Sequence, residues 1–354
     1  MITLVAAARP NFMKVGPVVK ALAGRVPTTL VHTGQHYDAA MSAVFFDQLK
    51  LPPPDVNLDV GSGTHAQQTA AVMVRFEEHL AAHPADAVVV VGDVNSTLAV
   101  SLVAAKAGVP VAHVEAGLRS RDWSMPEEIN RVLTDRLSRW LLTPSPDADE
   151  NLAAEGIPAD RVHLVGNVMI DTLLANIEAA RKRQAAMADE LGLPGEYAVL
   201  TLHRPANVDD AASLAVMMRS IGDVAAELPV VFPVHPRTRQ RLGAGAPPGI
   251  VCVDPLPYLD FIGLVAESRL VMTDSGGIQE ETSVLGVPCL TLRDNTERPI
   301  TCQLGTNRVI GTNPLAIAPA AQAALAADTR PADIPLWDGH AAERIADVLL
   351  ADLA

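Results

Sequence analysis

Short apolar runs alternate along this chain with longer segments in which apolar residues recur at helical spacing. The runs fall at residues 2–7, 29–32, 87–91, 109–114, 141–143 and 162–165, and again at 197–202, 230–234, 250–253, 270–273 and 289–293. Runs of this kind are typical of strands that are buried on both faces of a parallel sheet. Because helical segments separate them, the pattern predicts an α/β protein built from doubly wound parallel sheets.

A change of character near residues 166–171 divides the chain into two similar halves. An Ala-, Lys- and Arg-rich helix follows to about Leu191, and a second series of strands and helices then begins. We therefore predict an N-terminal domain at residues 1–165 and a C-terminal domain at 166–336, with a cleft between them. Residues 337–354 form a last amphipathic helix, which is free to pack back on the first domain.

Composition narrows the class of ligand and the compartment. Hydrophobic residues make up 49% of the 354 positions but aromatic residues only 3%, so the core must consist mainly of Ala, Val and Leu. A net charge of −14 argues against a nucleic-acid or anionic-membrane surface. The three cysteines lack metal-binding spacing, and neither a signal-peptide pattern nor a run of ~20 apolar residues occurs. These features predict a cytoplasmic protein.

The segment at residues 270–288 has the pattern of a phosphate site. An apolar strand leads directly into Asp274-Ser275-Gly276-Gly277, and a helix follows from Ile278 to Leu285. The N–H groups and dipole of that helix start favour an anion, and Gly276 and Gly277 let it approach the main chain. Glu281, one turn further on, can accept hydrogen bonds from a ribose diol. The alternative is an ordinary strand–helix turn capped by Ser275.

Arg9 and Lys14 follow the first strand, ahead of a helix that we predict from Pro17 to Leu22. Across a turn both could reach one diphosphate, Arg9 as a fork and Lys14 as a point charge. The alternative is a solvated helix start. Because a helix N-terminus disfavours cations, two of them there indicate an anionic partner.

Three carboxylates, Asp93, Glu115 and Glu127, are candidates for acid–base chemistry. Asp93 and Glu115 each come directly after an apolar run, so both are expected at one edge of the sheet. Carboxylates crowded together have pKa values that spread apart, which supplies an acid and a base. The alternatives are a cap of the next helix for Asp93 and a favourable helix-start charge for Glu127. Arg131 and Asp135, spaced i, i+4, are predicted to form a surface or interface pair.

Two histidines, His203 and His235, come directly after strands of the second half. At equivalent edges, opposite carboxylates, they are candidates for acid–base or phosphate contacts. The alternative is a structural hydrogen-bond donor. Zinc is a poor fit because the chain has no HExxH motif, and the candidate carboxylates and histidines lie far apart in sequence.

Eight motifs in order resemble one known family, the non-hydrolysing UDP-N-acetylglucosamine 2-epimerases. The motifs lie at residues 9–14, 32–38, 92–97, 113–119, 126–131, 201–205, 274–281 and 293–299. Each motif is a weak signal, but together they span about 300 positions. The resemblance implies the GT-B fold, in which two Rossmann-like domains face a central cleft. It also implies a homodimer and a reaction that needs no metal or nicotinamide cofactor.

The resemblance implies the interconversion of UDP-GlcNAc and UDP-ManNAc through elimination of UDP to 2-acetamidoglucal and re-addition. It assigns acid–base roles to Asp93, Glu115, Glu127 and His203. It also implies a set of substrate ligands, with Glu281 at the ribose and Phe261 at the uracil. The other members of that set are Arg9, Lys14, Gln35, His36, His235, Ser275, Gly276, Gly277 and Arg298, with His203 at the diphosphate as well.

Two departures from the family pattern leave the substrate and regulation open. Ala8 stands where a hydroxyl residue is usual, and Pro205-Ala206 replaces an Arg-Glu pair. In some bacterial members the second segment helps bind an allosteric UDP-GlcNAc, so that regulation is in doubt. The alternatives are an epimerase of a related NDP-HexNAc, a hydrolysing 2-epimerase, a GT-B glycosyltransferase, and a sensor that binds without turnover.

Overall fold

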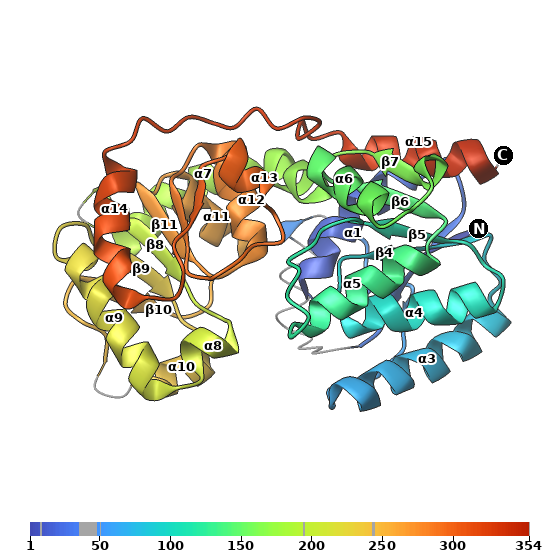
Figure 1. Ribbon diagram of the computed structural model, residues 1–354, viewed down its shortest axis with the longest axis horizontal. Coiled ribbons are helices and arrows are strands. Elements are labelled where there is room, and N and C mark those ends of the chain that lie inside the picture. The colour runs from blue at the N-terminus through green and yellow to red at the C-terminus, as the bar shows by residue number, and fades with distance from the viewer. Residues whose placement is uncertain (8, 35–47, 50, 194, 243–244, 354) are drawn as a thin grey trace. The chain divides into compact units, whose positions relative to one another are not determined.

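The computed structural model describes the whole chain except residues 8, 35–47, 50, 194, 243–244 and 354 (Figure 1). The chain divides into two compact units, Met1–Leu174 with Pro335–Ala354, and Ala175–Ile334. The predicted boundary lay at residues 165 and 166. The units separate later because helix α7 (Val168–Glu190) starts in the first unit and continues into the second.

The first unit is built on a parallel sheet with the strand order β3-β2-β1-β4-β5-β6-β7. This order is that of doubly wound folds, with the switch in direction between β1 and β4. The strands are β1 (Ile2–Ala6), β2 (Thr28–His32), β3 (Val56–Asn57), β4 (Ala87–Val91), β5 (Val111–Val114), β6 (Trp140–Thr143) and β7 (Val162–Leu164). Besides α7, the helices are α1 (Arg9–Leu22), α3 (His65–Ala82), α4 (Asn95–Lys106), α5 (Pro126–Leu137), α6 (Pro146–Ala154), the 3₁₀ turn η1 (Ala159–Arg161) and α15 (Ala341–Leu353).

The second unit repeats this topology with the strand order β10-β9-β8-β11-β12-β13, and its switch lies between β8 and β11. Its strands are β8 (Ala198–Thr201), β9 (Val230–Pro233), β10 (Ile250–Val253), β11 (Leu270–Thr273), β12 (Cys289–Thr291) and β13 (Asn307–Val309). Its helices are α8 (Pro205–Val208), α9 (Ala211–Ala225), α10 (Pro236–Arg241), α11 (Tyr258–Ala266), α12 (Gly276–Leu285), α13 (Ile300–Gln303), the 3₁₀ turn η2 (Pro314–Ala316) and α14 (Ile317–Leu325). The predicted doubly wound parallel sheets are therefore confirmed.

Every apolar run that predicted a strand contains one, with ends that differ by a few residues. The pattern missed β3 and β13, which are short edge strands. β13 reads Asn-Arg-Val, and the side chain of Asn307 is buried among hydroxyl and amide groups rather than in the apolar core. Such strands carry no apolar run to reveal them.

The prediction for helix α1 was wrong at its start, because α1 begins at Arg9 rather than at Pro17. Pro17 lies inside the helix and has no N–H to donate to the carbonyl of Met13, four residues earlier. The hydroxyl of Thr172 donates to that carbonyl instead, at 2.5 Å. A tertiary contact thus satisfies the acceptor that the proline leaves, and Lys14 lies within the helix.

The C-terminal helix α15 packs against α1 in the first unit. Its start is fixed by the carboxylate of Asp171, which accepts from the N–H groups of Ala341 and Ala342 at 3.1 and 2.7 Å. The burial of Asp171 raises the pKa of this carboxyl, while those two N–H groups act in the opposite direction.

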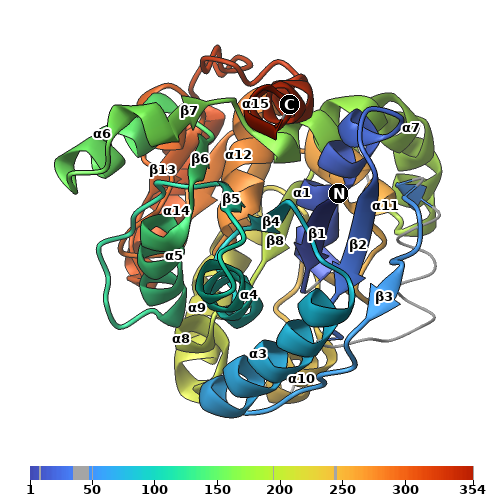
Figure 2. The ribbon, with the colours of Figure 1, turned by 90° about the vertical axis from the view of Figure 1, so that its right-hand side faces the viewer.

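Helices α3 and α4 pack against each other in the first unit (Figure 2). Their buried residues, including Phe76 and Val100, share one core with Val5, Val88 and Val90 of the strands. Helix α3 starts at the predicted capping box, in which Thr64 accepts from the N–H of Gln67 and the Gln67 side chain accepts from the N–H of Thr64. In the described part of the chain, no helix is long and apolar enough to cross a membrane.

Candidate active site

In the first unit, polar side chains gather over Gly92, which ends β4 at the switch point of the sheet. Gly92 has a φ of +68°, a conformation that glycine adopts at no steric cost. A Cβ at this position would stand 3.3 Å from Lys14 Nζ, 3.4 Å from Asn11 Nδ2 and 3.4 Å from Glu115 Oε2. The predicted meeting of the ends of β1, β4 and β5 therefore brings Lys14 and Glu115 together with the turn that carries Asp93.

Glu115 is held in an unusual position by its surroundings. Its φ of +71° lies in the left-handed region, which costs a non-glycine residue on the order of 1–3 kcal/mol and is enriched at functional sites. The N–H of Glu115 donates to the carbonyl of Leu142 at 3.1 Å, and its buried carboxylate forms an ion pair with Lys14. Lys14 thus has a carboxylate partner, in addition to the phosphate role that the sequence predicted.

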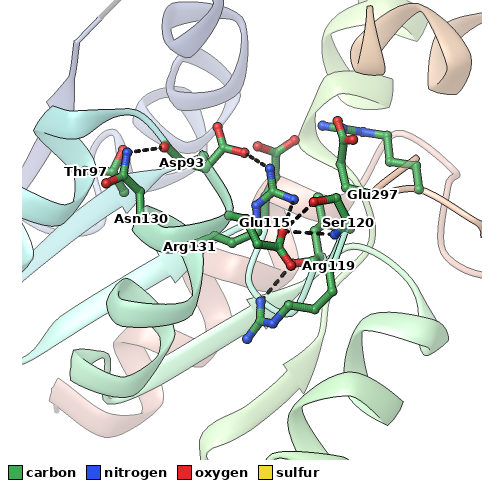
Figure 3. A network of polar contacts seen from close by, with 12 residues as sticks. Asp93, Thr97, Glu115, Arg119, Ser120, Asn130, Arg131 and Glu297 are labelled. Carbon is green, nitrogen blue, oxygen red and sulfur yellow. Dashed lines mark hydrogen bonds and ion pairs between the residues drawn. The ribbon is translucent and has the colours of Figure 1, made fainter. Parts of the chain in front are cut away.

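Asp93 is contacted from helix α5. Arg131 forms an ion pair with its carboxylate, and Asn130 Nδ2 donates to its backbone carbonyl at 2.9 Å (Figure 3). The Asp93 side chain is 31% exposed, whereas that of Arg131 is 3% exposed. One carboxylate at this edge is therefore accessible and is oriented by a buried cation.

Helix α5 corrects the prediction that Arg131 and Asp135 form a surface or interface pair, because both side chains are buried and each pairs with other residues. The helix also buries Glu128 and Asn130, while Ile129 and Leu133 are 40% and 45% exposed. This arrangement inverts the usual amphipathic pattern, in which the apolar stripe faces the core. The sequence carries a sign of this arrangement. The few apolar residues of this helix do not form a continuous stripe that could face the core, which indicates that polar residues are buried instead.

Glu128, which sequence analysis did not select, anchors the loop before α5. Its carboxylate accepts from the N–H and hydroxyl of Ser120, both at 2.9 Å, from the N–H of Arg121 at 2.8 Å and from Arg131 at 2.9 Å. The neighbouring Glu127, the predicted acid–base residue, is exposed in the first turn of α5. The two adjacent acids therefore differ, with Glu128 fully engaged in structure and Glu127 accessible.

A second buried network lies behind these carboxylates. His113 contacts Asp135 Oδ1 at 2.6 Å through Nδ1 and the carbonyl of Gly92 at 2.8 Å through Nε2. Asp135 Oδ2 also accepts from Gly117 N at 3.1 Å and from Arg119 at 2.8 Å. Burial alone would raise the pKa of Asp135, but His113 and Arg119 outweigh it and lower that pKa.

In the second unit, the turn after β8 is organised by Asp274, which follows β11. This fully buried carboxylate accepts from the N–H groups of His203 at 3.0 Å and Arg204 at 2.9 Å, and from Asn207 Nδ2 at 3.0 Å. Burial would raise the pKa of Asp274, but the neighbouring His203 side chain, together with Asn207 and the two N–H groups, lowers it. His203 Nδ1 lies 3.7 Å from Asp274, and its side chain is 59% exposed. Its backbone is therefore fixed while its ring is accessible.

The start of helix α12 is the predicted anion site, and that role stays a prediction. Ser275 is the N-cap residue, yet its side chain makes no capping hydrogen bond. A Cβ at Gly276 would stand 2.6 Å from Glu297 Oε1, so only glycine fits without displacing a neighbour. Arg298, a predicted ligand, forms buried ion pairs with Glu280 and Glu297 beside this turn.

Glu281, the predicted ribose ligand, is buried within α12. Its Oε1 accepts from the hydroxyl of Tyr258 at 2.9 Å. Burial, together with the charge of Glu280, raises the pKa of Glu281 to about 8 although the Tyr258 hydrogen bond opposes the rise. Burial and the neighbouring Glu281 also raise the pKa of Tyr258 well above its usual value.

The other predicted ligands are placed as follows. Phe261 is half-buried in the first turn of α11, and Gly277 is the second residue of α12. His235 is the N-cap of α10, where its Nδ1 accepts from the N–H of Arg237 at 3.3 Å. Gln35 and His36 lie outside the described residues, as does the side chain of Arg9. Among the described residues, no group of three or more His, Cys, Asp or Glu side chains could hold a metal ion.

The known proteins that this chain resembles in sequence and in structure include several 2-epimerases of UDP-sugars. The family profile described as UDP-N-acetylglucosamine 2-epimerase matches residues 20–350. The chain is 39% identical over 360 residues to a UDP-N-acetylglucosamine 2-epimerase of Methanocaldococcus jannaschii, with 98% of both chains covered. It is 40% identical over 354 residues to a UDP-2,3-diacetamido-2,3-dideoxy-D-glucuronate 2-epimerase of Pseudomonas aeruginosa, with 97% of both covered. The crystal structure of the Methanocaldococcus jannaschii UDP-GlcNAc 2-epimerase in complex with UDP-GlcNAc and UDP superposes with a TM-score of 0.91 over 99% of both chains, at 39% identity.

Proposed function

The chain belongs to the UDP-N-acetylglucosamine 2-epimerase family, and from this premise we propose that it interconverts UDP-GlcNAc and UDP-ManNAc without net hydrolysis. Its two Rossmann-like units have the GT-B fold. The observation that carries the proposal is the first switch point, where Asp93 and Glu115 each have a cationic partner. A site with two oriented carboxylates suits a reaction in which protons leave and return at one carbon.

The proposed reaction has two balanced steps. A base removes the proton from C2, the C1–O bond breaks, and UDP departs with the bonding electron pair to leave 2-acetamidoglucal. A UDP oxygen then bonds to C1, while an acid returns a proton to the opposite face of C2. No net oxidation occurs, and the chemistry calls for general acid–base groups and for stabilisation of the departing diphosphate.

We assign proton transfer to residues of the first unit. Asp93 and Glu115 are the principal pair, because both lie at the switch point and each has a fixed cationic partner. Glu127 completes the set as an exposed acid at the start of α5, and His203 of the second unit supplies a fourth titratable group. Lys14 pairs with Glu115 before substrate binds, and its proposed phosphate contact requires that it share its charge.

We assign UDP binding to residues of the second unit, with Arg9 and Lys14 of the first as further phosphate ligands. Ser275, Gly276 and Gly277 offer backbone N–H groups at the start of α12 to the diphosphate. Glu281 binds the ribose, and Phe261 lies against the uracil. His235, Arg298, Gln35 and His36 complete the proposed ligand set. The UDP complex of the Methanocaldococcus jannaschii enzyme supports a nucleotide role for this fold.

A second substrate is a specific candidate. The Pseudomonas aeruginosa relative acts on a UDP-diacetamido-glucuronate, and its 40% identity to this chain matches the 39% of the Methanocaldococcus jannaschii UDP-GlcNAc epimerase. Inversion at C2 is common to both reactions, so the proposed acid–base set serves either sugar.

Proton NMR of UDP-GlcNAc with the protein in D₂O tests the proposal. We expect UDP-ManNAc to appear and deuterium to enter C2, with free UDP and free sugar remaining minor. The same experiment with the UDP-diacetamido-glucuronate tests the second substrate. Free ManNAc with stoichiometric UDP would indicate a hydrolysing enzyme. The absence of C2 exchange with either sugar would contradict the epimerase proposal and favour a glycosyltransferase or a sensor.

We further propose that the enzyme acts in the cytoplasm as a homodimer. Light scattering of the purified protein would give the mass directly, against the 37.3 kDa of one chain. A mass of one chain at micromolar concentration would contradict the dimer.

A further inference from the structure

The buried pair His113 and Asp135 has no part in the function proposed above. Both side chains are 0% exposed and lie within the first unit, His113 on β5 and Asp135 on α5. An ionisable pair in the interior is weak support for stability, since removing two charges from water costs about what their attraction returns. Its presence at this place therefore calls for another explanation.

Both ring nitrogens of His113 are engaged in hydrogen bonds. A backbone carbonyl only accepts, so Nε2 donates to Gly92. At 2.6 Å, a hydrogen lies between Nδ1 and Asp135 Oδ1. Asp135 Oδ2 accepts from Gly117 N and from Arg119. The pair therefore links the carbonyl of Gly92 to the N–H of Gly117 through an unbroken series of hydrogen bonds.

The two ends of this pair reach the backbone on either side of the proposed acid–base residues. The Gly92 carbonyl that accepts from His113 belongs to the residue directly before Asp93. The Gly117 N–H that donates to Asp135 lies two residues after Glu115. Gly92 and Gly117 have φ values of +68° and +81°, and a glycine backbone has more conformational freedom than any other. External hydrogen bonds are therefore what orient these two turns.

We propose that His113 and Asp135 are positioning residues, which hold the Asp93 turn and the Glu115 turn at the separation that proton transfer requires. The proposal rests on the proposed function, since it assigns the pair a task in that reaction. Neither residue touches the substrate. Misplacement of reacting groups by about 1 Å can cost on the order of 100-fold in rate, so fixing these turns has a measurable consequence.

Two substitutions separate the two hydrogen bonds of the ring. His113→Gln places an amide nitrogen near the position of Nε2 and retains the Gly92 contact, whereas His113→Asn imitates Nδ1 and retains Asp135. His79→Gln is the matched control, because His79 is also a buried histidine of the first unit but lies on α3 and stacks on His83 at 4.8 Å. All three variants lose one buried imidazole.

We expect kcat to fall about 10- to 100-fold in both His113 variants, while KM and the Kd of UDP change less than about threefold. His79→Gln should keep kcat within about threefold of the wild-type value, whether or not its thermal stability changes. A kcat that is unchanged in both His113 variants would overturn the proposal. A loss that matches the lost fraction of folded protein would also overturn it.

A double-mutant cycle shows whether His113 acts through Asp93. If it does, His113→Gln in an Asp93→Asn background should lower the residual rate by less than threefold, because the two effects share one cause. Full additivity of the two losses would contradict positioning of Asp93. A loss of stability that leaves the protein folded does not change the coupling that the cycle measures.

Two readouts need no activity and keep this proposal separate from the proposed function. ¹H NMR should show slowly exchanging ring N–H resonances of His113 in the wild type, and the one at Nδ1 should shift or disappear in Asp135→Asn. Ring hydrogens of His113 that exchange freely with solvent in the wild type would overturn the proposal. If the wild type turns over no UDP-sugar, the proposed function fails. A crystal structure of His113→Gln then decides, and unchanged 92–93 and 115–117 turns would refute positioning.

Discussion

Each of the two units buries an aspartate beside the end of a strand, but the two carboxylates have different partners. In the first unit, Asp135 is paired with His113 and with the buried guanidinium of Arg119. In the second, Asp274 accepts from neutral donors, the N–H groups of His203 and Arg204 and the amide of Asn207, while the exposed His203 ring lies 3.7 Å away. Both arrangements lower the pKa of the acid against the effect of burial.

The difference shows how one topology can support two tasks, proton transfer and the binding of a diphosphate. The first unit surrounds its edge with ion pairs, which hold side chains that carry charge, namely Asp93 and Glu115. The second uses its aspartate to hold backbone, and thereby shapes a turn next to a helix start whose N–H groups are available to an anion. Charged partners suit proton transfer, whereas fixed backbone donors suit the binding of a diphosphate.

Removal of each aspartate should have the largest effect and tests the difference between the two units most directly. Asp135→Ala leaves the fully buried His113 without its partner and removes one of the two carboxylates that pair with the buried Arg119, the other being Glu155, which should cost about 3–5 kcal/mol of unfolding free energy. Asp274→Ala leaves buried neutral donors unsatisfied beside a His203 ring that solvent can reach, for which about 1–3 kcal/mol is expected. Urea unfolding of both variants measures the difference. Equal losses, or a larger loss for Asp274→Ala, would contradict the distinction between the units.

Asp93→Asn should sharpen the division of tasks. The substitution preserves the shape of the side chain but removes its proton-accepting form, so kcat should fall by at least about 100-fold. The Kd of UDP should change less than threefold, because we assign the nucleotide to the second unit. Steady-state kinetics and calorimetry give the two numbers. Turnover close to that of the wild type would remove Asp93 from the acid–base set.

Gly276→Ala should have the opposite effect to Asp93→Asn, because it should weaken the binding of UDP. The added Cβ meets Glu297 at 2.6 Å and intrudes where the diphosphate would approach the main chain. We expect the Kd of UDP to rise about tenfold, a change of about 1.4 kcal/mol. Melting of the UDP-free variant serves as the control for folding. A variant that binds UDP as tightly as the wild type does would place the nucleotide elsewhere.

Glu281 offers a contrast in the direction of the pKa shift within the second unit. Its pKa is raised to about 8 by burial, while that of Asp274 is lowered. A raised carboxyl pKa means that the folded state retains a proton that the unfolded state loses above about pH 4.3. Its stability contribution is therefore fully present at lower pH and is lost as the pH rises through about 8, by at most about 1.4 kcal/mol per pH unit.

Glu281→Gln should abolish that dependence, since glutamine does not titrate. The melting temperature of the variant relative to the wild type should then rise between pH 5.5 and pH 8. Thermal melts of the UDP-free proteins in matched buffers measure it, with Glu77→Gln as an exposed control of the same substitution type. A difference that is constant with pH, or that falls, would contradict the raised pKa.

The sequence by itself determined the fold class, because strands that are buried in a parallel sheet appear in the sequence as continuous apolar runs. It also placed Asp93, Glu115, His203 and Ser275 at strand ends, since the polar residue after such a run must lie at the sheet edge. Periodicity could not reveal β13 or the true start of α1, because hydrogen bonds from distant residues stabilise both.

Only the tertiary structure decided the partners of those residues. Arg131, predicted in a surface or interface pair with Asp135, is buried against Asp93, and Asp135 is joined to His113 across 22 positions of sequence. The physical reason is that a charge is stabilised by whichever group the packing brings within about 3 Å. Distance along the chain does not specify that group, whereas hydrophobic periodicity is local and specifies the strands directly.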